Sequence, residues 1–427
     1  MNGLYGSFLP HTLMPDQHLT INDPVYGFIN VPRGLLCRVI AHPLFQRLER
    51  IRQLGMAPFV YPGAHHTRKQ HVIGAFHLTQ AALATLMQKG HFIFDSEAEA
   101  TEAAILLHDV GHGPFSHVLE GELVKEISHE EISLLMMQAV NRDLQGDLSL
   151  ALKVFTGEYP KPFLHELISS QLDMDRLDYL CRDSFYTGVR EGNIGAARIV
   201  KTLDLVDERL VVDYKGIYSV ENYLMARRLM YWQVYLHKTA LAAEAMFRAI
   251  LRRAHHLVSA GTPLFASPAL HYFLSREVSR EDFSGEDSEA LHYYAALDDS
   301  DLICAVKVWA THPDPVLSVL AADFTNRRLF KSTEVEADRR DEALDHYRSA
   351  IKQQLSLSDE DAAYFVDTQS LCNEMYSRAA EGIGILMPSG EVRDVSEVSN
   401  IIRRDGELPD VQKHYVIHRA IEGDKFL

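Results

Sequence analysis

Residues 105–117, ILLHDVGHGPFSH, place four titratable side chains in a segment that is otherwise apolar or rich in glycine. They are His108, Asp109, His112 and His117. Burying such groups is costly unless each of them has a partner. The sequence therefore predicts either a set of hydrogen-bonded core residues or a functional site.

Other segments carry side chains that suit the same chemistry. His71 lies in the stretch RKQH at the start of a helical pattern, and SHEE (128–131) adds a histidine and two carboxylates. LDMDRLDYLCRD (172–183) places four aspartates within about three helical turns. Taken alone, His108 fits a hydrogen-bonded core residue, and the acidic segment 172–183 fits an ordinary amphipathic helix. Only their combination points to a site.

A mixed set of imidazoles and carboxylates suits a divalent ion such as Fe, Mn, Ni, Zn or Mg. Such an ion lowers the pKa of a bound water and supplies hydroxide near neutral pH. Histidines beyond the ligands can donate to phosphate or act as a general acid, and nearby arginine and lysine can hold phosphate oxygens. These residues therefore predict a metal-assisted phosphoryl hydrolase on a helical scaffold.

The helix that carries His108 has recognisable start and stop signals. Ser96 and Glu99 fit a capping box, in which each side chain satisfies a free backbone N–H. Apolar residues then recur at helical spacing up to His108, so this histidine is expected on the apolar face. Gly111 and Gly113-Pro114 are expected to end the helix.

The remaining pattern is mainly helical, with a few strands. Residues 33–54, 69–88, 221–258 and most of 264–356 read as helical, and 21–31 has β-type alternation. A hairpin is predicted over 209–220 with its turn near Lys215-Gly216, and strands are predicted over 382–395 and 413–420. The predicted fold is mainly α with a small β-hairpin and a small C-terminal α/β region. We expect a helical core over 1–258, a helical extension over 259–340 and the α/β region over 341–427.

Composition limits the classes of partner. The formal net charge of −17 argues against stable binding to duplex nucleic acid, which needs a basic surface. Four scattered cysteines without a CxxC pair argue against a disulfide framework or a thiolate zinc site, and they are expected to be reduced and mostly buried. With no membrane-length apolar run and no signal-peptide pattern at the start, a cytoplasmic protein is expected.

The spacing His71 … His108-Asp109 … Asp175 resembles the H…HD…D signature of HD-domain metal phosphohydrolases. The resemblance covers about residues 20–335. It is closest to the branch of bacterial dNTP triphosphohydrolase-like proteins and the catalytic domain of the vertebrate SAM-and-HD-domain dNTPase. It rests on INDPVYGFI, FQRLERIRQLG, FVYPGAHHTRKQHVIG, HDVGHGPFSH, SHEE, LDMDRLDYLCRD, YWQVYLHK and NRRLFK. It implies that 1–258 is an HD phosphohydrolase core.

The same resemblance implies a role for each matching residue. The metal ligands would be His71, His108, Asp109 and Asp175, holding one divalent ion, with a second Mg²⁺ on the substrate phosphates. His112 and His129 would contact the phosphate next to the sugar, Glu130 would orient a histidine, and His117 would protonate the leaving 5′-oxygen. The substrate residues would be Arg68, Arg176 and Lys238 on the polyphosphate, Gln53, Leu54, Tyr179 and Asp183 at the sugar, and Arg227 and Tyr235 lining the pocket.

The implied reaction is hydrolysis of a dNTP to a deoxynucleoside and triphosphate by a homo-oligomer, either a dimer or a tetramer. An HD phosphohydrolase of another nucleotide or phosphoester, and a nucleotide- or RNA-binding regulator with vestigial catalysis, remain alternatives. Three positions depart from the vertebrate pattern for a guanine-nucleotide activator site: Leu19, Ala41 and Glu49. Because a carboxylate at 49 would repel a triphosphate, activation by GTP is predicted to be absent.

Overall fold

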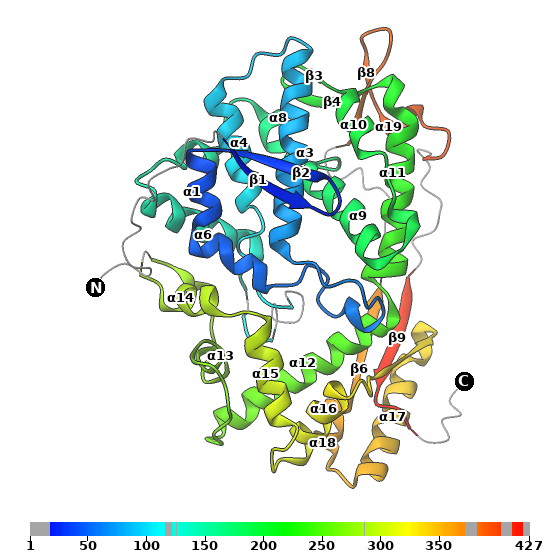
Figure 1. The fold of residues 1–427 in the computed structure, drawn as a ribbon. Coiled ribbons are helices and arrows are strands. Elements are labelled where there is room, and N and C mark those ends of the chain that lie inside the picture. Colours follow the sequence, from blue (N-terminus) through cyan, green and yellow to red (C-terminus); the bar gives the residue numbers. More distant parts are fainter. Residues whose placement is uncertain are drawn as a thin grey trace.

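The computed structural model describes residues 18–115, 122–124, 126–285, 287–371, 382–402 and 412–421. Its architecture is mainly helical, as predicted, with three small sheets (Figure 1). None of the helices in these ranges is both long enough and apolar enough to cross a membrane.

The centre of the first region is α3 (Arg68–Gln88), which packs against α4 (Asp95–Leu107) and α9 (Met174–Thr187). At the start of α3 a capping box fixes the first turn, because the Thr67 N–H donates to Gln70 Oε1 over 2.9 Å. The helix predicted for 33–54 is interrupted at Pro43. The surrounding helices are α1 (Leu35–Ala41), α2 (Pro43–Gln46), α6 (His129–Asp143), α7 (Ser149–Phe155), α8 (Pro162–Glu166) and α10 (Ala196–Thr202).

Helix α4 differs from its prediction at both ends. The predicted Ser96/Glu99 capping box is wrong: the helix begins at Asp95, and the Glu97 carboxylate accepts from the Phe94 N–H over 2.9 Å. The helix ends at Leu107, so the residues from His108 to Gly111 form turns. His108 and His112 therefore do not share a helical face, and hydrogen bonds from outside α4 must shape this segment.

The predicted hairpin over 209–220 is shifted in the structure. Strand β3 (Leu203–Val206) pairs with β4 (Arg209–Asp213), and the turn between them is Asp207-Glu208, both at positive φ. Gly216 is needed for another reason, since an added Cβ there would overlap the side chains of Thr202 and Val212. The predicted strand pair at the N-terminal side is confirmed as β1 (His18–Asp23) and β2 (Gly27–Pro32).

The long helix predicted for 221–258 is divided. Helix α11 (Ile217–Met230) is followed by a π-helical turn over Tyr231–Tyr235, and α12 (Lys238–Ser259) then begins after His237. Such π turns insert extra backbone into a helix and are frequent near functional sites. Here the turn carries Tyr231 and Tyr235 towards α9.

Later helices surround α12 in the lower part of Figure 1, and the C-terminal strands join two separate sheets. The helices there are α13 (Pro268–Leu274), α14 (Glu289–Ala296), α15 (Asp299–Trp309), α16 (Pro315–Thr325), α17 (Arg340–Leu355) and α18 (Asp359–Ala362). The short helix α19 (Val395–Val398) lies in the upper part of Figure 1 and contacts β7 and β8. One sheet has the order β3, β4, β7 (Gly384–Leu386), β8 (Val392–Asp394). The other has the order β5 (Lys331–Val335), β9 (Lys413–His418), β6 (Val366–Leu371).

The strands predicted over 382–395 and 413–420 are thus confirmed, but they pair with strands from earlier regions. β7 runs parallel to β4, and β9 is antiparallel to β5. The regional boundaries at 258 and 340 stay predictions. Among the cysteines, Cys304 is exposed rather than buried, Cys37 and Cys181 are partly buried, and Cys372 lies outside the described residues.

Candidate metal centre

Three of the four predicted metal ligands come together from distant parts of the chain. His71 lies in the first turn of α3, His108 directly after α4, and Asp175 in the first turn of α9. One ligand atom from each lies within 4.8 Å of the other two. Asp175 Oδ1 is 2.9 Å from His71 Nε2 and 3.5 Å from His108 Nε2.

Asp109, the fourth predicted ligand, lies beside this group. Its carboxylate is 3.8 Å from His71 Nε2 and 3.5 Å from His108 Nε2. It also accepts a hydrogen bond of 2.6 Å from Arg68 and lies 3.2 Å from His112 Nε2. Although burial opposes ionisation, the adjacent His112 imidazole and the Arg68 guanidinium hold the pKa of Asp109 well below its usual range. An anionic Asp109 therefore faces the cluster.

The two histidines are oriented as metal ligands would be. Nδ1 of His108 lies 2.7 Å from the Ile105 carbonyl oxygen, and Nδ1 of His71 lies 2.7 Å from Asp178 Oδ2. Because each Nδ1 faces an acceptor, a proton held there would leave the Nε2 lone pair available to a metal ion bound in the cluster. Both Nε2 atoms are buried without a hydrogen bond of acceptable geometry. Two orphaned imidazole nitrogens beside carboxylates fit a divalent metal ion.

Asp178 contacts the cluster, although the sequence analysis assigned it no role. Besides facing His71, it accepts two hydrogen bonds of 3.0 Å from Arg182, which in turn donates to Asp23 over 2.8 Å. All four side chains are buried. Although burial opposes ionisation, the Arg182 guanidinium and the hydrogen bond with His71 lower the pKa of Asp178. The signal in the sequence was its spacing, since 175, 178 and 182 lie on one helical face.

Histidines and arginine line one side of the cluster. The rings of His112 and His129 stack with centroids 3.9 Å apart, and His129 is the first residue of α6. Burial and the charge of Arg68 lower the pKa of His112 to about 3, so this imidazole is neutral near pH 7. Glu130, predicted to orient a histidine, is exposed and accepts from the Ser128 hydroxyl over 3.5 Å. His117 lies outside the described residues.

A chain of aromatic and acidic side chains lines the other side. The Tyr179 ring centroid is 6.4 Å from that of His71 and 5.9 Å from that of Tyr235. The Tyr235 hydroxyl donates to Asp183 over 2.7 Å, and His66 Nε2 lies 2.7 Å from the other carboxylate oxygen. His66, which lies in the FVYPGAHHTRKQHVIG motif but was assigned no role, thus fixes a predicted sugar-side residue.

The other predicted substrate residues make the following contacts. The Gln53 N–H donates to the His66 carbonyl over 3.0 Å, and Leu54 packs partly buried against the core. Arg176 Nε donates to the Ser170 carbonyl over 2.8 Å, and Arg227 donates to the Gln171 side chain over 3.0 Å. Lys238 is the exposed first residue of α12.

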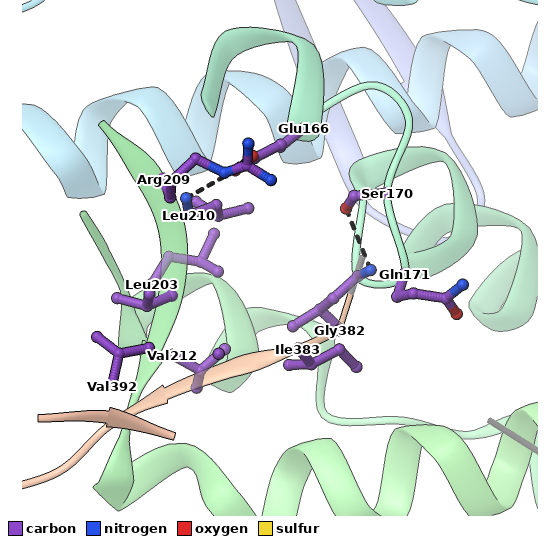
Figure 2. Close-up of a pocket in the computed structure, with 13 residues that line it drawn as sticks. Glu166, Ser170, Gln171, Leu203, Arg209, Leu210, Val212, Gly382, Ile383 and Val392 are labelled. Carbon is purple, nitrogen blue, oxygen red and sulfur yellow. Dashed lines mark hydrogen bonds and ion pairs between the residues drawn. The ribbon is translucent and has the colours of Figure 1, made fainter. Parts of the chain in front are cut away.

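The loop at Ser170 and Gln171 also borders a cavity of about 160 Å³, shown in Figure 2. At one end of the cavity Arg209 pairs with Glu166 over 2.6 Å. The cavity contains no predicted metal ligand, so it is separate from the cluster. Its other lining residues are Leu172, Leu203, Leu210, Val211, Val212, Gly382, Ile383, Gly384 and Val392.

Comparisons with known proteins agree with this geometry. Residues 68–183 match the HD domain, and residues 194–262 match the HD associated region. The chain is 51% identical to a phosphohydrolase from Bacteroides thetaiotaomicron whose crystal structure it resembles with a TM-score of 0.89, over 94% of this chain and 100% of that one.

Two curated relatives extend the comparison. Uncharacterized protein YwfO of Bacillus subtilis is 32% identical over 400 residues, which cover 90% of this chain and 89% of the relative. Human deoxynucleoside triphosphate triphosphohydrolase SAMHD1 is 28% identical over 275 residues, covering 54% of this chain and 44% of the relative. With the matched domain containing all four predicted ligands, this chain belongs to the HD-domain phosphohydrolases and is related to SAMHD1.

Proposed function

We propose that the protein hydrolyses deoxynucleoside triphosphates to a deoxynucleoside and triphosphate. The observation that carries the proposal is the cluster of His71, His108 and Asp175, near the stacked rings of His112 and His129 and the ring of Tyr179. Two relatives named as deoxynucleoside triphosphate triphosphohydrolases, from human and Dictyostelium discoideum, match 54% and 53% of this chain.

In this proposal His71, His108, Asp109 and Asp175 hold one divalent ion, which is Fe, Mn, Ni, Zn or Mg, and a second Mg²⁺ accompanies the substrate phosphates. A bound ion of this kind lowers the pKa of water and polarises a phosphoryl oxygen. Asp178 keeps the His71 ring in the orientation that presents Nε2.

The chain's own residues bind and orient the triphosphate. Arg68, whose guanidinium lies beside Asp109, holds the polyphosphate together with Arg176 and Lys238. The stacked rings of His112 and His129 donate to the phosphate next to the sugar. Glu130, next to His129 in the chain, is proposed to orient a histidine, and His117 to give the proton to the leaving 5′-oxygen.

On the sugar side, Tyr179 packs against the deoxyribose. Gln53, Leu54 and Asp183 complete this surface, and Asp183 is fixed there by His66 and Tyr235. Arg227 and Tyr235 line the remaining wall. A tyrosine against the ribose leaves no room for a 2′-hydroxyl, so ribonucleotides are expected to be poor substrates.

The test combines metal analysis of the purified protein with a panel of nucleotides and identification of the products. We expect triphosphate release from dNTPs, and we expect Asp175→Asn to lose both the metal and about 10²-fold or more in kcat/KM. Asp341→Asn, which also removes an acid from the first turn of a helix, is the matched control and should change neither.

Each other outcome has a distinct meaning. Release of orthophosphate or pyrophosphate assigns the site to another phosphoester, and tight nucleotide binding without turnover in any divalent metal assigns a binding role. Full metal content and activity in Asp175→Asn would show that the proposed centre is wrong. We also propose a cytoplasmic homo-oligomer, a dimer or tetramer, which light scattering after gel filtration would measure.

A further inference from the structure

Arg47 is a buried arginine next to the metal centre that the proposed mechanism does not use. It begins the 3₁₀ turn Arg47–Arg50, and only 1% of its surface is exposed. A guanidinium carries five N–H donors in a rigid planar fork and stays charged. Its burial is therefore costly unless those donors are satisfied, and the acceptors show what the residue does.

The fork of Arg47 joins two backbone segments that are distant in sequence. Nη1 donates to the carbonyl oxygens of Val110 and His112, both at 2.8 Å. These carbonyls flank Gly111 in the segment that follows α4. On the other side, Nε donates to the Ala295 carbonyl over 3.2 Å, and Nη2 lies within 3.4 Å of two further carbonyls at the end of α14.

The segment 108–112 depends on such bonds because it has little regular structure of its own. Ser133 Oγ accepts from the Gly111 N–H over 2.9 Å and donates to the His108 carbonyl over 2.7 Å. The Tyr294 hydroxyl donates to the Gly111 carbonyl over 3.0 Å, and the Arg47 guanidinium lies over the Tyr294 ring. The segment is thus fastened to α6, to α14 and to Arg47.

We propose that Arg47 is a positioning residue of the metal centre, fixing the segment that presents Asp109 and His112 by bonding the carbonyls on both sides of Gly111. It follows that the end of α14, in the predicted helical extension, is part of the support of the centre. The predicted effect of Arg47 on metal binding depends only on the ligand cluster, whereas its predicted effect on dNTP turnover rests on the proposed function.

The first experiment compares Arg47→Lys with Arg253→Lys. Lysine keeps the charge but loses the planar fork. Arg253 is the matched control, since it is also largely buried and bonds Asp314 and Asp361 elsewhere in the structure. Mn²⁺ affinity is measured by calorimetry, backbone exchange over 109–113 by hydrogen–deuterium exchange, and kcat and KM with a dNTP.

We expect Arg47→Lys to weaken Mn²⁺ binding by about 10- to 100-fold, to raise exchange over 109–113, and to lower kcat more than it changes KM. Arg253→Lys should lower thermal stability and leave Mn²⁺ affinity within about twofold, because its partners lie outside the cluster. Folded Arg47→Lys protein with wild-type Mn²⁺ affinity and wild-type exchange would overturn the proposal. If Arg47→Lys loses Mn²⁺ affinity and the wild-type protein turns over no dNTP, the positioning role is supported and the proposed substrate is refuted.

If Arg47→Lys does not fold, a second pair of variants with smaller changes tests the same segment. Tyr294→Phe removes only the hydroxyl that bonds the Gly111 carbonyl, and should weaken Mn²⁺ binding by about three- to tenfold. Tyr347→Phe, at another buried tyrosine whose hydroxyl faces Thr333, should leave it unchanged. Equal Mn²⁺ affinities in the two variants would overturn the proposal.

Discussion

Replacing Asp178 by asparagine tests how His71 is prepared for a metal. The carboxylate faces three donors, His71 Nδ1 at 2.7 Å and two nitrogens of Arg182 at 3.0 Å. Asparagine replaces the two acceptor oxygens of this carboxylate by one acceptor oxygen and one N–H₂ donor group. If that oxygen stays with Arg182, the amide N–H₂ meets His71 Nδ1, which can then accept only by moving its proton to Nε2. A protonated Nε2 has no lone pair for a metal.

Two magnitudes follow from these contacts. Losing the partner that orients a metal-binding histidine costs about 10- to 100-fold in metal affinity. Weakening one half of a buried ion pair costs up to about 3–5 kcal/mol of folding free energy, and Arg182 keeps Asp23 at 2.8 Å, so we expect about 3 kcal/mol. Asp23→Asn is the matched control, because it removes the other carboxylate from Arg182 without touching His71.

The assay pairs urea unfolding, followed by circular dichroism, with Mn²⁺ calorimetry at pH 7.5. Both variants should be less stable, and only Asp178→Asn should lose Mn²⁺ affinity. Wild-type affinity in Asp178→Asn would refute the orientation argument. An equal loss of affinity in Asp23→Asn would show that general destabilisation, rather than the imidazole tautomer, governs binding.

Three further predictions concern other parts of the molecule. Burial raises the pKa of Glu244 to about 7, against a nearby Arg248 that lowers it, so the folded state holds this proton more tightly than the unfolded chain. The stability linked to Glu244 is therefore present below about pH 4.5 and is lost as the pH rises towards 7. Glu244→Gln should stabilise the protein by on the order of 1–3 kcal/mol at pH 8 but little at pH 4.5, as measured by urea unfolding at both pH values. Gly111→Ala should destabilise the protein by about 3 kcal/mol in the same unfolding assay, because an added Cβ would overlap the backbone of α6 at His129 and Ser133. GTP should not accelerate dNTP hydrolysis in a steady-state assay, because the exposed carboxylate of Glu49, which lies 3.4 Å from Lys69 Nζ, would repel a triphosphate. A cooperative GTP response that is lost on mutation near 19–49 would contradict this prediction.

The sequence was sufficient to predict the cluster of His71, His108 and Asp175 and most helices, because both depend on residue type and spacing. It was insufficient where several local solutions compete. Acids at 95, 97 and 99 all offer caps near the start of α4. Glu97 is selected by distant partners, since its carboxylate also accepts from Tyr159 and Lys161.

The supporting residues of the centre were hidden for a related reason. Asp178 reads as one acid among four, and Arg47 as one basic residue in a charged stretch. Only tertiary packing shows that the first faces His71 and that the second is buried against backbone carbonyls. The Lys215-Gly216 prediction failed because glycine can serve close packing as well as a turn.

The sheet formed by β5, β9 and β6 has a consequence for the order of folding. The middle strand is the last to be made: residues 413–418 follow both of the strands that they join. Until β9 has been synthesised, β5 and β6 each lack their shared neighbour and present open edges, which are sites of mispairing between chains. A ribosome adding about 5–20 residues per second leaves this interval open for seconds. Completion of the sheet is therefore a late event, and a chain that stops before residue 413 would leave both strands as aggregation-prone edges.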